Sequence, residues 1–328
     1  MARKFTESFD LETLDQFSSA TAATVVSSSI GGGNFAMSSG GEQFKQFSSG
    51  DSEMYFAFYL QPDNPGDNAG HKSIAWMNGS TVLGSLRFNG SRQLYLYVGS
   101  SPVATGTYVW SDSESRHIQV YVKLDDSTGI IQVKIDDILE IDYAGDTKPG
   151  SETEIDAFKH EADGRFAAII VNDTSGPEDN SWPGVVRMRG RKPDADGNFN
   201  DFDRDPASPT TAYTHLDETG APDPADIVSS DVNGDRQSLR FPSHGLIRAQ
   251  VLSNNFFYHM RKISSGEGTH GLARLSDNVE EMDAAPRALS TSFRTEIFRY
   301  TTNPVTELPW TLDEAQEDEY ESIMEAVT

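Results

Sequence analysis

Apolar and polar side chains alternate in short segments along much of the chain, and turn-forming residues separate these segments. From Ile118 to Leu124 every second residue is apolar, and the segment 130–135 repeats this alternation. Because successive side chains of a strand point to opposite faces, a period of two predicts strands with one buried face. The residues DDSTG between the two segments predict a hairpin loop, and Asp136-Asp137 predicts a second turn.

Further strands are predicted where segments rich in aromatic and β-branched residues lie between turn clusters. In the first part of the chain they are residues 53–60, 72–77, 82–88, 92–98 and 138–143. Later in the chain they are residues 238–241, 245–253, 256–264 and 291–302. Regularly spaced hairpins of this kind favour an all-β fold made of antiparallel sandwiches.

The chain ends in a segment with a different signal. Thr311 and Glu314 form a capping-box pattern, which predicts a short helix. The following YESIMEAV is expected to return as a strand, with a longer helix as the alternative. Residues 191–213 are rich in Pro, Asp, Asn and Gly, so we expect two domains, residues 1–192 and residues 193–328. Both are predicted to be β-sandwich, jelly-roll domains, the second with the short C-terminal helix.

The charge balance changes the list of candidate partners. The chain has 51 acidic and 26 basic residues, a formal net charge of -25. Nucleic acid and anionic membranes are therefore expected to be poor partners. An acidic surface also suits a halophilic protein, because salt screens its self-repulsion. The alternative interpretation is an ordinary, well-solvated acidic surface.

No cysteine is present among the 328 residues, so neither disulfides nor thiolate metal sites are expected. The N-terminal MARKFTESFDLETLDQF lacks the apolar core of a signal peptide. No apolar run approaches the length of a membrane span. These patterns predict a protein that is made soluble in a cytoplasm.

The segment EIDAFKHE (154–161) raises the question of glycosidase chemistry, because Glu154 and Asp156 begin like a Glu-x-Asp-x-Glu glucanase motif. A retaining glycosidase needs two carboxylates roughly 5 Å apart. The second catalytic carboxylate would stand at position 158 or 159, where this chain has Phe158 and Lys159. The sequence therefore predicts no catalytic residues here, and a glycoside hydrolase is disfavoured.

Other candidate sites are weaker. Asp194, Asp196, Asn198 and Asn200 alternate oxygen ligands as calcium loops do, but the glycine spacing and the closing Glu of an EF-hand are missing. Asp231, Asn233 and Asp235 make a similar half-match, and a solvated linker is the simpler interpretation of both. No cofactor is expected, with calcium left open. The four tryptophans are expected to be core or interface anchors rather than a sugar platform.

Two long stretches resemble known proteins. SRHIQVYVKLDDSTGIIQVKIDDILEIDYAGDT (115–147) resembles the paired central strands of a concanavalin A-like, laminin G-like jelly roll, which commonly ends in GDT. AAIIVNDTSGPEDNSWPGVVRMRGRKPDADGNFNDF (167–202) is similar to a segment of virion structural proteins of tailed bacteriophages and related archaeal viruses. The most specific pieces are VNDTSG (171–176) and the distant PWT (309–311).

This resemblance implies a non-enzymatic structural component of a tailed virus particle. Such a protein is assembled in the host cytoplasm and displayed on head or tail as a decoration, turret, fibre or tail-associated protein. Its partners would be other virion proteins and further copies of itself, with a trimer favoured. The apolar residues of NNFFYHM (254–260) offer surface for that contact. The alternative is a receptor- or glycan-binding adhesin of the particle.

Overall fold

A computed structural model divides the chain into two compact units, Met1–Gly190 and Arg191–Thr328. The sequence predicts the boundary between the two domains after residue 192. The structure describes residues 3–7, 17–21, 23–27, 35–39, 41–66, 72–161, 164–177, 179–188, 190–207, 211–216, 223, 225–242, 254–262, 268–276, 279–282, 287–292, 294–303, 306–316 and 319–326.

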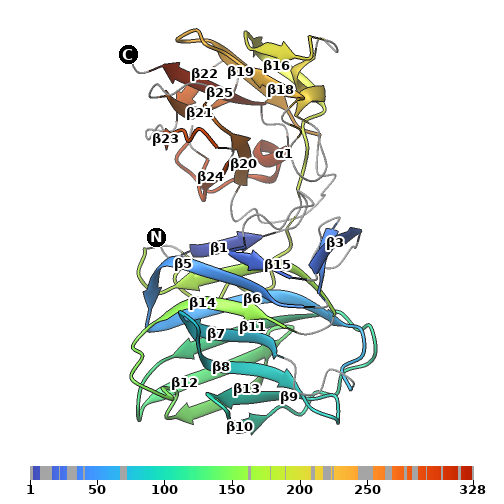
Figure 1. Ribbon diagram of the computed structural model, residues 1–328, viewed down its shortest axis with the longest axis vertical. Coiled ribbons are helices and arrows are strands. Elements are labelled where there is room, and N and C mark those ends of the chain that lie inside the picture. The colour runs from blue at the N-terminus through green and yellow to red at the C-terminus, as the bar shows by residue number, and fades with distance from the viewer. Residues whose placement is uncertain are drawn as a thin grey trace. The chain divides into compact units, whose positions relative to one another are not determined.

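The first unit, blue to green in Figure 1, is a sandwich of two antiparallel sheets. Its strands are β1 (Arg3–Glu7), β2 (Ser19–Ala20), β3 (Ala23–Ser27), β4 (Phe35–Ser39), β5 (Gln43–Asp51), β6 (Glu53–Pro62), β7 (Lys72–Asn78), β8 (Thr81–Phe88), β9 (Leu94–Val98), β10 (Ser101–Thr105), β11 (Arg116–Lys123), β12 (Gly129–Ile135), β13 (Ile138–Gly145), β14 (Ile155–His160) and β15 (Gly164–Asp173). We name the eight-stranded sheet β13-β12-β11-β6-β15-β4-β3, with β1 paired to β15, sheet A. Sheet B has seven strands in the order β10-β9-β8-β7-β14-β5-β2.

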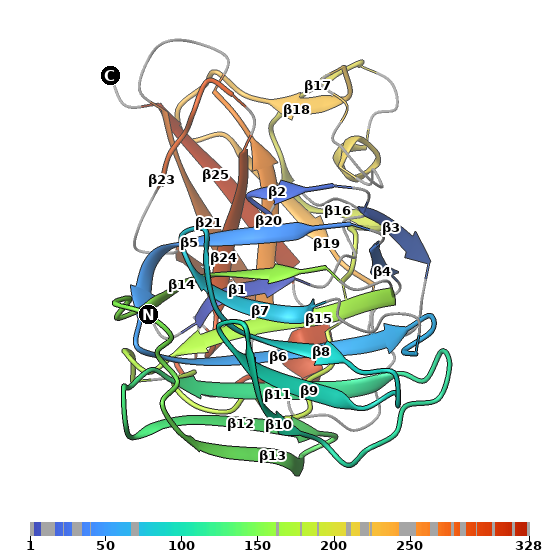
Figure 2. The same cartoon turned by 60° about the horizontal axis from the view of Figure 1, so that its bottom comes forward.

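Hairpins of consecutive strands alternate in this unit with pairs of strands that are distant in the sequence. β6 lies between β11 and β15 in sheet A, whereas β14 lies between β7 and β5 in sheet B. The chain therefore crosses between the sheets, and the core joins residues that are distant in the sequence. The edge strands β10 and β13 lie side by side at one end of the sandwich in Figures 1 and 2.

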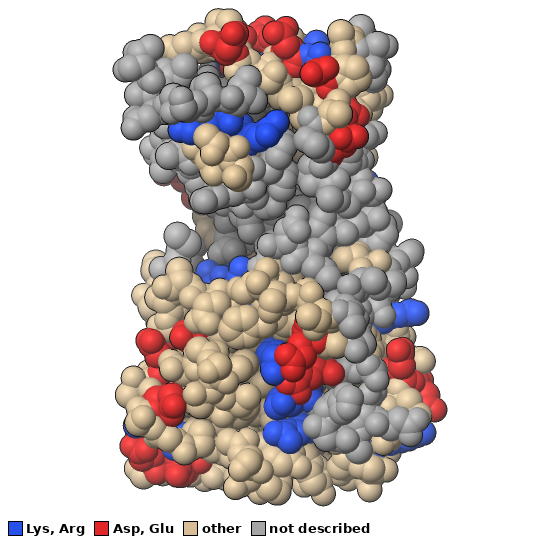
Figure 3. Space-filling view, in the orientation of Figure 1, with Lys and Arg blue, Asp and Glu red and all other residues tan. Residues whose placement is uncertain are grey.

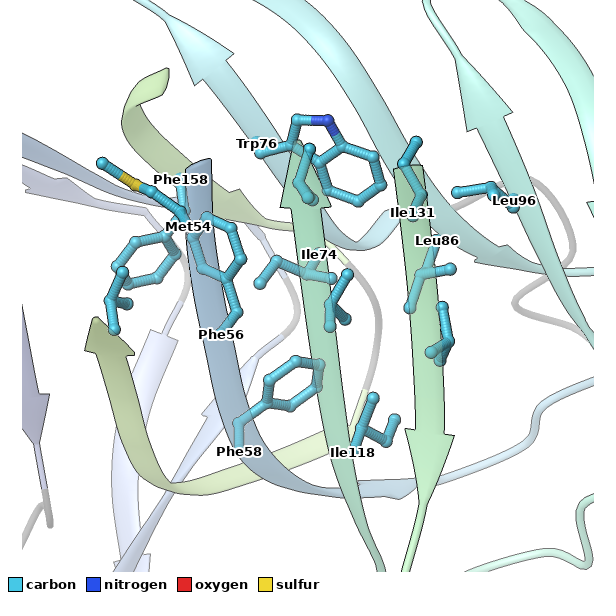
Figure 4. Close-up of a cluster of buried hydrophobic side chains, with 14 of the residues drawn as sticks. Met54, Phe56, Phe58, Ile74, Trp76, Leu86, Leu96, Ile118, Ile131 and Phe158 are labelled. Carbon is cyan, nitrogen blue, oxygen red and sulfur yellow. The ribbon is translucent and has the colours of Figure 1, made fainter. Parts of the chain in front are cut away.

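The core lies between the two sheets, where the predicted alternation places apolar side chains. Every second residue of β6 from Met54 to Leu60 belongs to it. These side chains face Ile74 and Trp76 of β7 and Phe158 of β14 (Figure 4). Burial of so many large apolar side chains is the main favourable term for folding.

Two tight turns shape the central hairpins of sheet A. Asp136 and Asp137 have φ angles of 50° and 65°, in the left-handed region that Asp tolerates better than most residues. Their carboxylates are also bonded: Asp136 accepts from the His117 amide at 3.0 Å, and Asp137 accepts from the Gln119 side chain at 2.5 Å. These bonds offset the strain of replacing the usual glycine, and the predicted turn is confirmed.

The GDT end of this stretch closes the β11–β12 hairpin. The Thr147 side chain is buried, and its hydroxyl donates to the Lys123 carbonyl at 2.7 Å. The same oxygen accepts from the Asp125 amide at 3.0 Å. Thr147 therefore ties the segment after β13 to the end of β11 and to the DDSTG loop.

The VNDTSG segment has an architectural role as well. Asn172 and Asp173 end β15, which pairs with β1. Asn172 accepts from Arg3 Nε at 3.0 Å, and Asp173 forms an ion pair with Lys4 at 2.6 Å. Asp173 also accepts from the amide and hydroxyl of Ser175. The motif thus holds the N-terminal strand on the edge of β15.

The second unit, yellow to red in Figure 1, is also antiparallel β throughout its described strands. Its elements are β16 (Ala195–Asn200), β17 (Asp203–Asp205), the 3-10 turn η2 (Ala212–His215), β18 (Ile227–Ser229), β19 (Arg236–Arg240), β20 (Asn254–Met260), β21 (Gly268–Ser276), β22 (Val279–Met282), β23 (Arg287–Ala288), β24 (Arg294–Tyr300), α1 (Leu312–Gln316) and β25 (Glu319–Ala326). Six strands form the sheet β16-β19-β25-β21-β22 with β23 paired to β21, and β17–β18 and β20–β24 are separate pairs.

The capping box predicted at the C-terminal helix is confirmed. Thr311 Oγ1 accepts from the Glu314 amide at 3.2 Å, and the Glu314 carboxylate accepts from the Thr311 amide at 2.8 Å. These reciprocal bonds satisfy amides at the start of α1. Trp310 is buried and donates from Nε1 to the Tyr300 carbonyl at 2.9 Å, so PWT anchors the helix start to β24.

The all-β, antiparallel fold class predicted from the sequence is confirmed. The final segment returns as a strand, β25, as expected. The strand predicted at 245–253 lies outside the described residues, as do most side chains of the NNFFYHM segment, whose backbone forms β20. No helix in the described part of the chain is long and apolar enough to cross a membrane.

Candidate functional site

The glucanase-like segment 154–161 lies on and beside β14, in the middle of sheet B. Phe158 points into the core and contacts the rings of Phe5 and Phe47 at 5.5 and 5.9 Å between centroids. A catalytic carboxylate at this position would be buried in an apolar cluster. Lys159, the other candidate position, forms ion pairs with Glu42 and Glu161.

The carboxylates of this segment serve other purposes. Asp156 accepts from the Gly79 amide at 2.7 Å, which fixes the β7–β8 turn against β14. Glu161 accepts from Lys72 and Lys159 at 2.6 and 2.5 Å. Burial opposes ionisation of Glu161, but the hydrogen bonds from Lys159 and Lys72 outweigh it and lower its pKa. The segment therefore offers no pair of free carboxylates for glycoside hydrolysis.

The calcium candidates of the second unit are spread along β16 and bonded to protein donors. Asp196 accepts from the amides of Ala212 and Tyr213 at 3.0 and 2.8 Å, which fixes the start of η2. Asn198 accepts from Arg240, and Asn200 accepts from Arg204. Asp194 precedes the strand, and its amide donates to the Arg240 carbonyl. The residues that the structure describes contain no group of three or more His, Cys, Asp or Glu side chains placed to hold a metal ion.

The tryptophans fit their predicted role as anchors. Trp76, Trp110 and Trp310 are buried. The half-buried Trp182 packs against Tyr55 and Tyr121 on the outer face of sheet A. Lys134 lies over its ring at 4.0 Å. One ring face of Trp182 is thus covered by a cation, which leaves it poorly suited to stack on a sugar.

A half-buried aromatic pair is found instead on the outer face of sheet B. In β9 the residues Leu94, Leu96 and Val98 are buried in the core, so the intervening Tyr95 and Tyr97 point outward. Both rings are half-buried, and their centroids lie 6.5 Å apart. Neither tyrosine hydroxyl has a hydrogen-bond partner among the described residues. The sequence analysis missed this pair, although the alternation in LYLYV is the signal for it.

Arg87 of β8 stands opposite Tyr95 in the β8–β9 ladder, and Ser85 stands opposite Tyr97. The Arg87 guanidinium lies over the Tyr97 ring, 4.0 Å from its centroid. Its Nε donates to the Ser85 hydroxyl at 3.0 Å. Within the described part of the chain Arg87 makes no ion pair, and neither of its two terminal amino groups has a hydrogen-bond acceptor.

Next to Arg87 lies a row of paired charges. Lys72 stands opposite Arg87 in the β7–β8 ladder, and Glu161 links Lys72 to Lys159. Burial lowers the pKa of Lys159, but its bonds to Glu161 and Glu42 outweigh burial and raise it. This row keeps two cations fixed on the face without leaving either free.

We call these side chains together the Tyr–Arg face. It consists of Lys72, Arg87, Tyr95, Tyr97, Lys159 and Glu161. Figure 3 shows Lys and Arg side chains gathered beside Asp and Glu side chains where Figure 1 shows β7 and β8. Among the described residues, these tyrosine hydroxyls and the terminal amino groups of Arg87 have no partner, so the face can stack on and hydrogen-bond to a polar ligand.

Comparison with known proteins gives no family. No protein-family model matches the chain, and no curated protein matches it. Solved structures with partial similarity include a sialidase (TM-score 0.40, 13% identity, covering 53% of this chain and 19% of that one). Another is domain 4 of AbnA, a GH43 extracellular arabinanase from Geobacillus stearothermophilus (TM-score 0.37, 12% identity, covering 53% and 94%). A third is the carbohydrate-binding module CBM66 from Bacillus subtilis (TM-score 0.31, 16% identity, covering 47% and 97%).

The chain thus spans about a fifth of the length of the sialidase that it resembles. Similarities this distant do not bear on ligand or reaction.

Proposed function

We propose that the protein is a non-enzymatic structural component of a tailed virus particle, displayed on its head or tail. The observation that carries the proposal is the resemblance of residues 167–202 to virion proteins. The contacts of these residues are compatible with a scaffold: VNDTSG holds β1, and PWT anchors α1. The glucanase-like segment has a core phenylalanine where a catalytic carboxylate is needed.

The proposal is tested on virus particles purified by density gradient from cells that express the gene. We expect the protein in the particle band at a fixed copy number relative to the major capsid protein, and we expect antibodies to label intact particles. Recovery only in the soluble host fraction would overturn the proposal. Particles that carry Glu154→Gln and Asp156→Asn should assemble and infect as the unmodified particles do.

Self-association is part of the same proposal. Virion components occupy symmetric positions, and cyclic symmetry lets each copy make identical contacts. We favour a trimer. Native mass measurement across protein concentration, in low and in molar salt, should show a trimer that persists on dilution in molar salt. A protein that stays monomeric at high concentration in molar salt counts against this state.

A second candidate function is adhesion of the particle to a host receptor or glycan. The observation that favours it is the Tyr–Arg face, where Tyr95 and Tyr97 present aromatic rings outward beside Arg87. Adsorption of the isolated protein to host cells separates this candidate from a purely structural role. Adsorption that disappears after removal of surface polysaccharide supports the adhesin.

A further inference from the structure

The unpaired arginine of the Tyr–Arg face indicates which ligand chemistry it fits. We propose that this face binds a carboxylate-bearing sugar, a uronic acid residue of an acidic polysaccharide, through Arg87, Tyr95 and Tyr97. The inference rests on the adhesin function proposed above and names its ligand class.

Arg87 is held ready for a planar anion. Stacking on Tyr97 and the bond from Nε to Ser85 fix the plane of the guanidinium, so little rotational freedom remains to be lost on binding. The two terminal amino groups then form a fork that matches the two oxygens of a carboxylate. A bidentate pair of this kind is among the stronger hydrogen-bonded contacts in proteins.

The lack of an acidic partner distinguishes Arg87 from the other buried and half-buried arginines described in the first unit. Acidic residues outnumber basic ones by 51 to 26. Among the buried and half-buried arginines that the structure describes in the first unit, Arg3, Arg92 and Arg116 have acidic partners and Arg87 does not. Arg3 pairs with Asp179, and Arg92 pairs with Asp112. With acidic groups so abundant, a half-buried guanidinium left without one is suited to an acid that comes from outside.

The tyrosines add what a sugar requires beyond charge. Tyr95 stands directly across from Arg87, and its ring lies 6.5 Å from that of Tyr97 along β9. Aromatic faces pack against the C–H groups of a sugar ring, while free phenol hydroxyls bond to sugar hydroxyls. A ligand bound to Arg87 therefore meets an aromatic ring on the neighbouring strand.

The fixed charges beside Arg87 argue for one carboxylate per sugar rather than a denser anion. Lys72 and Lys159 are both occupied by Glu161, so neither is free to neutralise a second charge. The Glu161 carboxylate would also repel a phosphate that carries two negative charges. Phosphorylated ligands and nucleic acids need several free cations, which the described part of this face does not offer.

The net charge predicts an inverted salt dependence for this binding. At about 10 mM salt the screening length is roughly 30 Å, so a chain of charge -25 repels an acidic polysaccharide at long range. At about 0.15 M the length falls to about 8 Å, and the contact between Arg87 and the carboxylate survives while the long-range repulsion does not. Affinity should therefore rise over this range, opposite to binding driven by counterion release.

The test uses the full chain and oligogalacturonate as the probe, with fully methyl-esterified oligogalacturonide as a neutral probe of the same sugar. Calorimetry at 0.15 M salt should show binding of the acidic probe, and we expect esterification to weaken it about tenfold or more. Arg87→Gln should lose a similar factor for the acidic probe only. Tyr95→Ala should weaken both probes.

The matched control is Arg165→Gln, which removes the same charge from an exposed position on β15 of the other sheet. It should bind as the unmodified protein does. Circular dichroism melts show whether each variant is folded. If Arg87→Gln does not fold, Arg87→Lys replaces it, because lysine keeps the charge and removes the two-pronged hydrogen-bonding geometry. The comparison of the acidic and esterified probes is also made on the unmodified protein, so it does not depend on any variant.

Two outcomes would overturn the inference in different ways. Equal binding of the acidic and esterified probes, unaffected by Arg87→Gln, would reject the carboxylate while leaving a glycan-binding face. If the protein binds neither probe nor a panel of neutral and acidic host polysaccharides at any salt concentration, the adhesin function itself fails.

Discussion

At the scale of single residues, several polar groups are buried where their side chains fix the architecture. Thr147 is fully buried, and its hydroxyl is hydrogen-bonded to Lys123 at the end of β11 and to Asp125 in the β11–β12 loop. His160 is fully buried among Phe58, Phe158 and Phe166, and its Nδ1 is hydrogen-bonded to the Ser73 carbonyl. The contribution of each residue to the free energy of unfolding depends on one polar group, the hydroxyl of Thr147 or the imidazole ring of His160. Substitutions that keep the size of the side chain and change this group therefore test the contribution.

Thr147→Val keeps the shape of the side chain and removes the hydroxyl. The Asp125 amide then loses a partner, and we expect the free energy of unfolding to fall by about 2 kcal/mol. Urea denaturation measures this loss. Thr147→Ser keeps the hydroxyl and should lose less. A Thr147→Val protein as stable as the unmodified one would contradict the role of this residue.

The buried His160 predicts a pH dependence. Burial lowers its pKa to about 4, although the bond to the Ser73 carbonyl opposes this, whereas an unfolded histidine titrates near 6.5. Between these values the unfolded chain binds a proton that the folded chain does not. Stability is therefore full above about pH 6.5 and falls as the pH drops toward 4.

His160→Asn keeps a polar side-chain amide near the position of Nδ1 but cannot titrate. We expect denaturant midpoints measured from pH 7 to pH 4.5 to fall less steeply in this variant than in the unmodified protein. His117, whose pKa burial also lowers to about 4, stays in both proteins and contributes equally. Parallel curves would show that His160 does not cause the dependence.

At the scale of elements, hydrogen bonds and ion pairs attach β1 to the rest of its sheet. The strand carries the adjacent cations Arg3 and Lys4, which contact Asn172, Asp179 and Asp173 around the end of β15. The VNDTSG segment therefore supplies the side chains that hold β1 in place. These side chains lie more than 160 residues from β1 along the chain.

Lys4→Ala should release this end of β1. The Asp173 carboxylate is buried, and without Lys4 no cation among the described residues forms an ion pair with it, although the Ser175 amide and hydroxyl still donate to it. We expect a loss of roughly 2 kcal/mol and faster hydrogen exchange in β1. Lys148→Ala is the matched control, since Lys148 pairs with the exposed Asp126 and should cost less than about 1 kcal/mol. Equal effects of the two changes would argue against the anchoring role.

At the scale of the whole molecule, the charge of -25 dominates long-range behaviour. The folded chain concentrates this charge in a smaller volume than the unfolded chain, so repulsion penalises folding most in dilute salt. The ion pairs of the first unit, such as Lys72 with Glu161, account for only part of the acidic groups.

We therefore expect the melting temperature to rise as sodium chloride increases from about 0.01 M to about 1 M, where the screening length falls from roughly 30 to 3 Å. Sodium sulfate should raise it further, because this salt also strengthens apolar burial. Thermal melts followed by circular dichroism provide the measurement. A flat or falling melting temperature would remove the argument for a saline habitat and leave the proposed virion role standing.

The sequence by itself determined the local elements of this protein. The alternation from Ile118 to Leu124, the Asp136-Asp137 turn and the Thr311 capping box each encode their structure within a few residues, because strand period, turn geometry and helix capping are local properties. The acidic charge likewise follows from composition alone.

The tertiary structure decided everything that depends on partners distant in the chain. The sheet order depends on pairings between distant strands, such as that of β6 with β11 and β15. The packing of Phe158 shows that position 158 of the glucanase-like segment faces the core. Arg87 and Tyr97 are separated along the chain by a turn, and the ladder between β8 and β9 places one over the other. Which residues are neighbours across two strands depends on the register of the pairing. A slip of one residue would move every side chain of a strand to the other face of the sheet, so the pattern along the chain alone does not specify these neighbours.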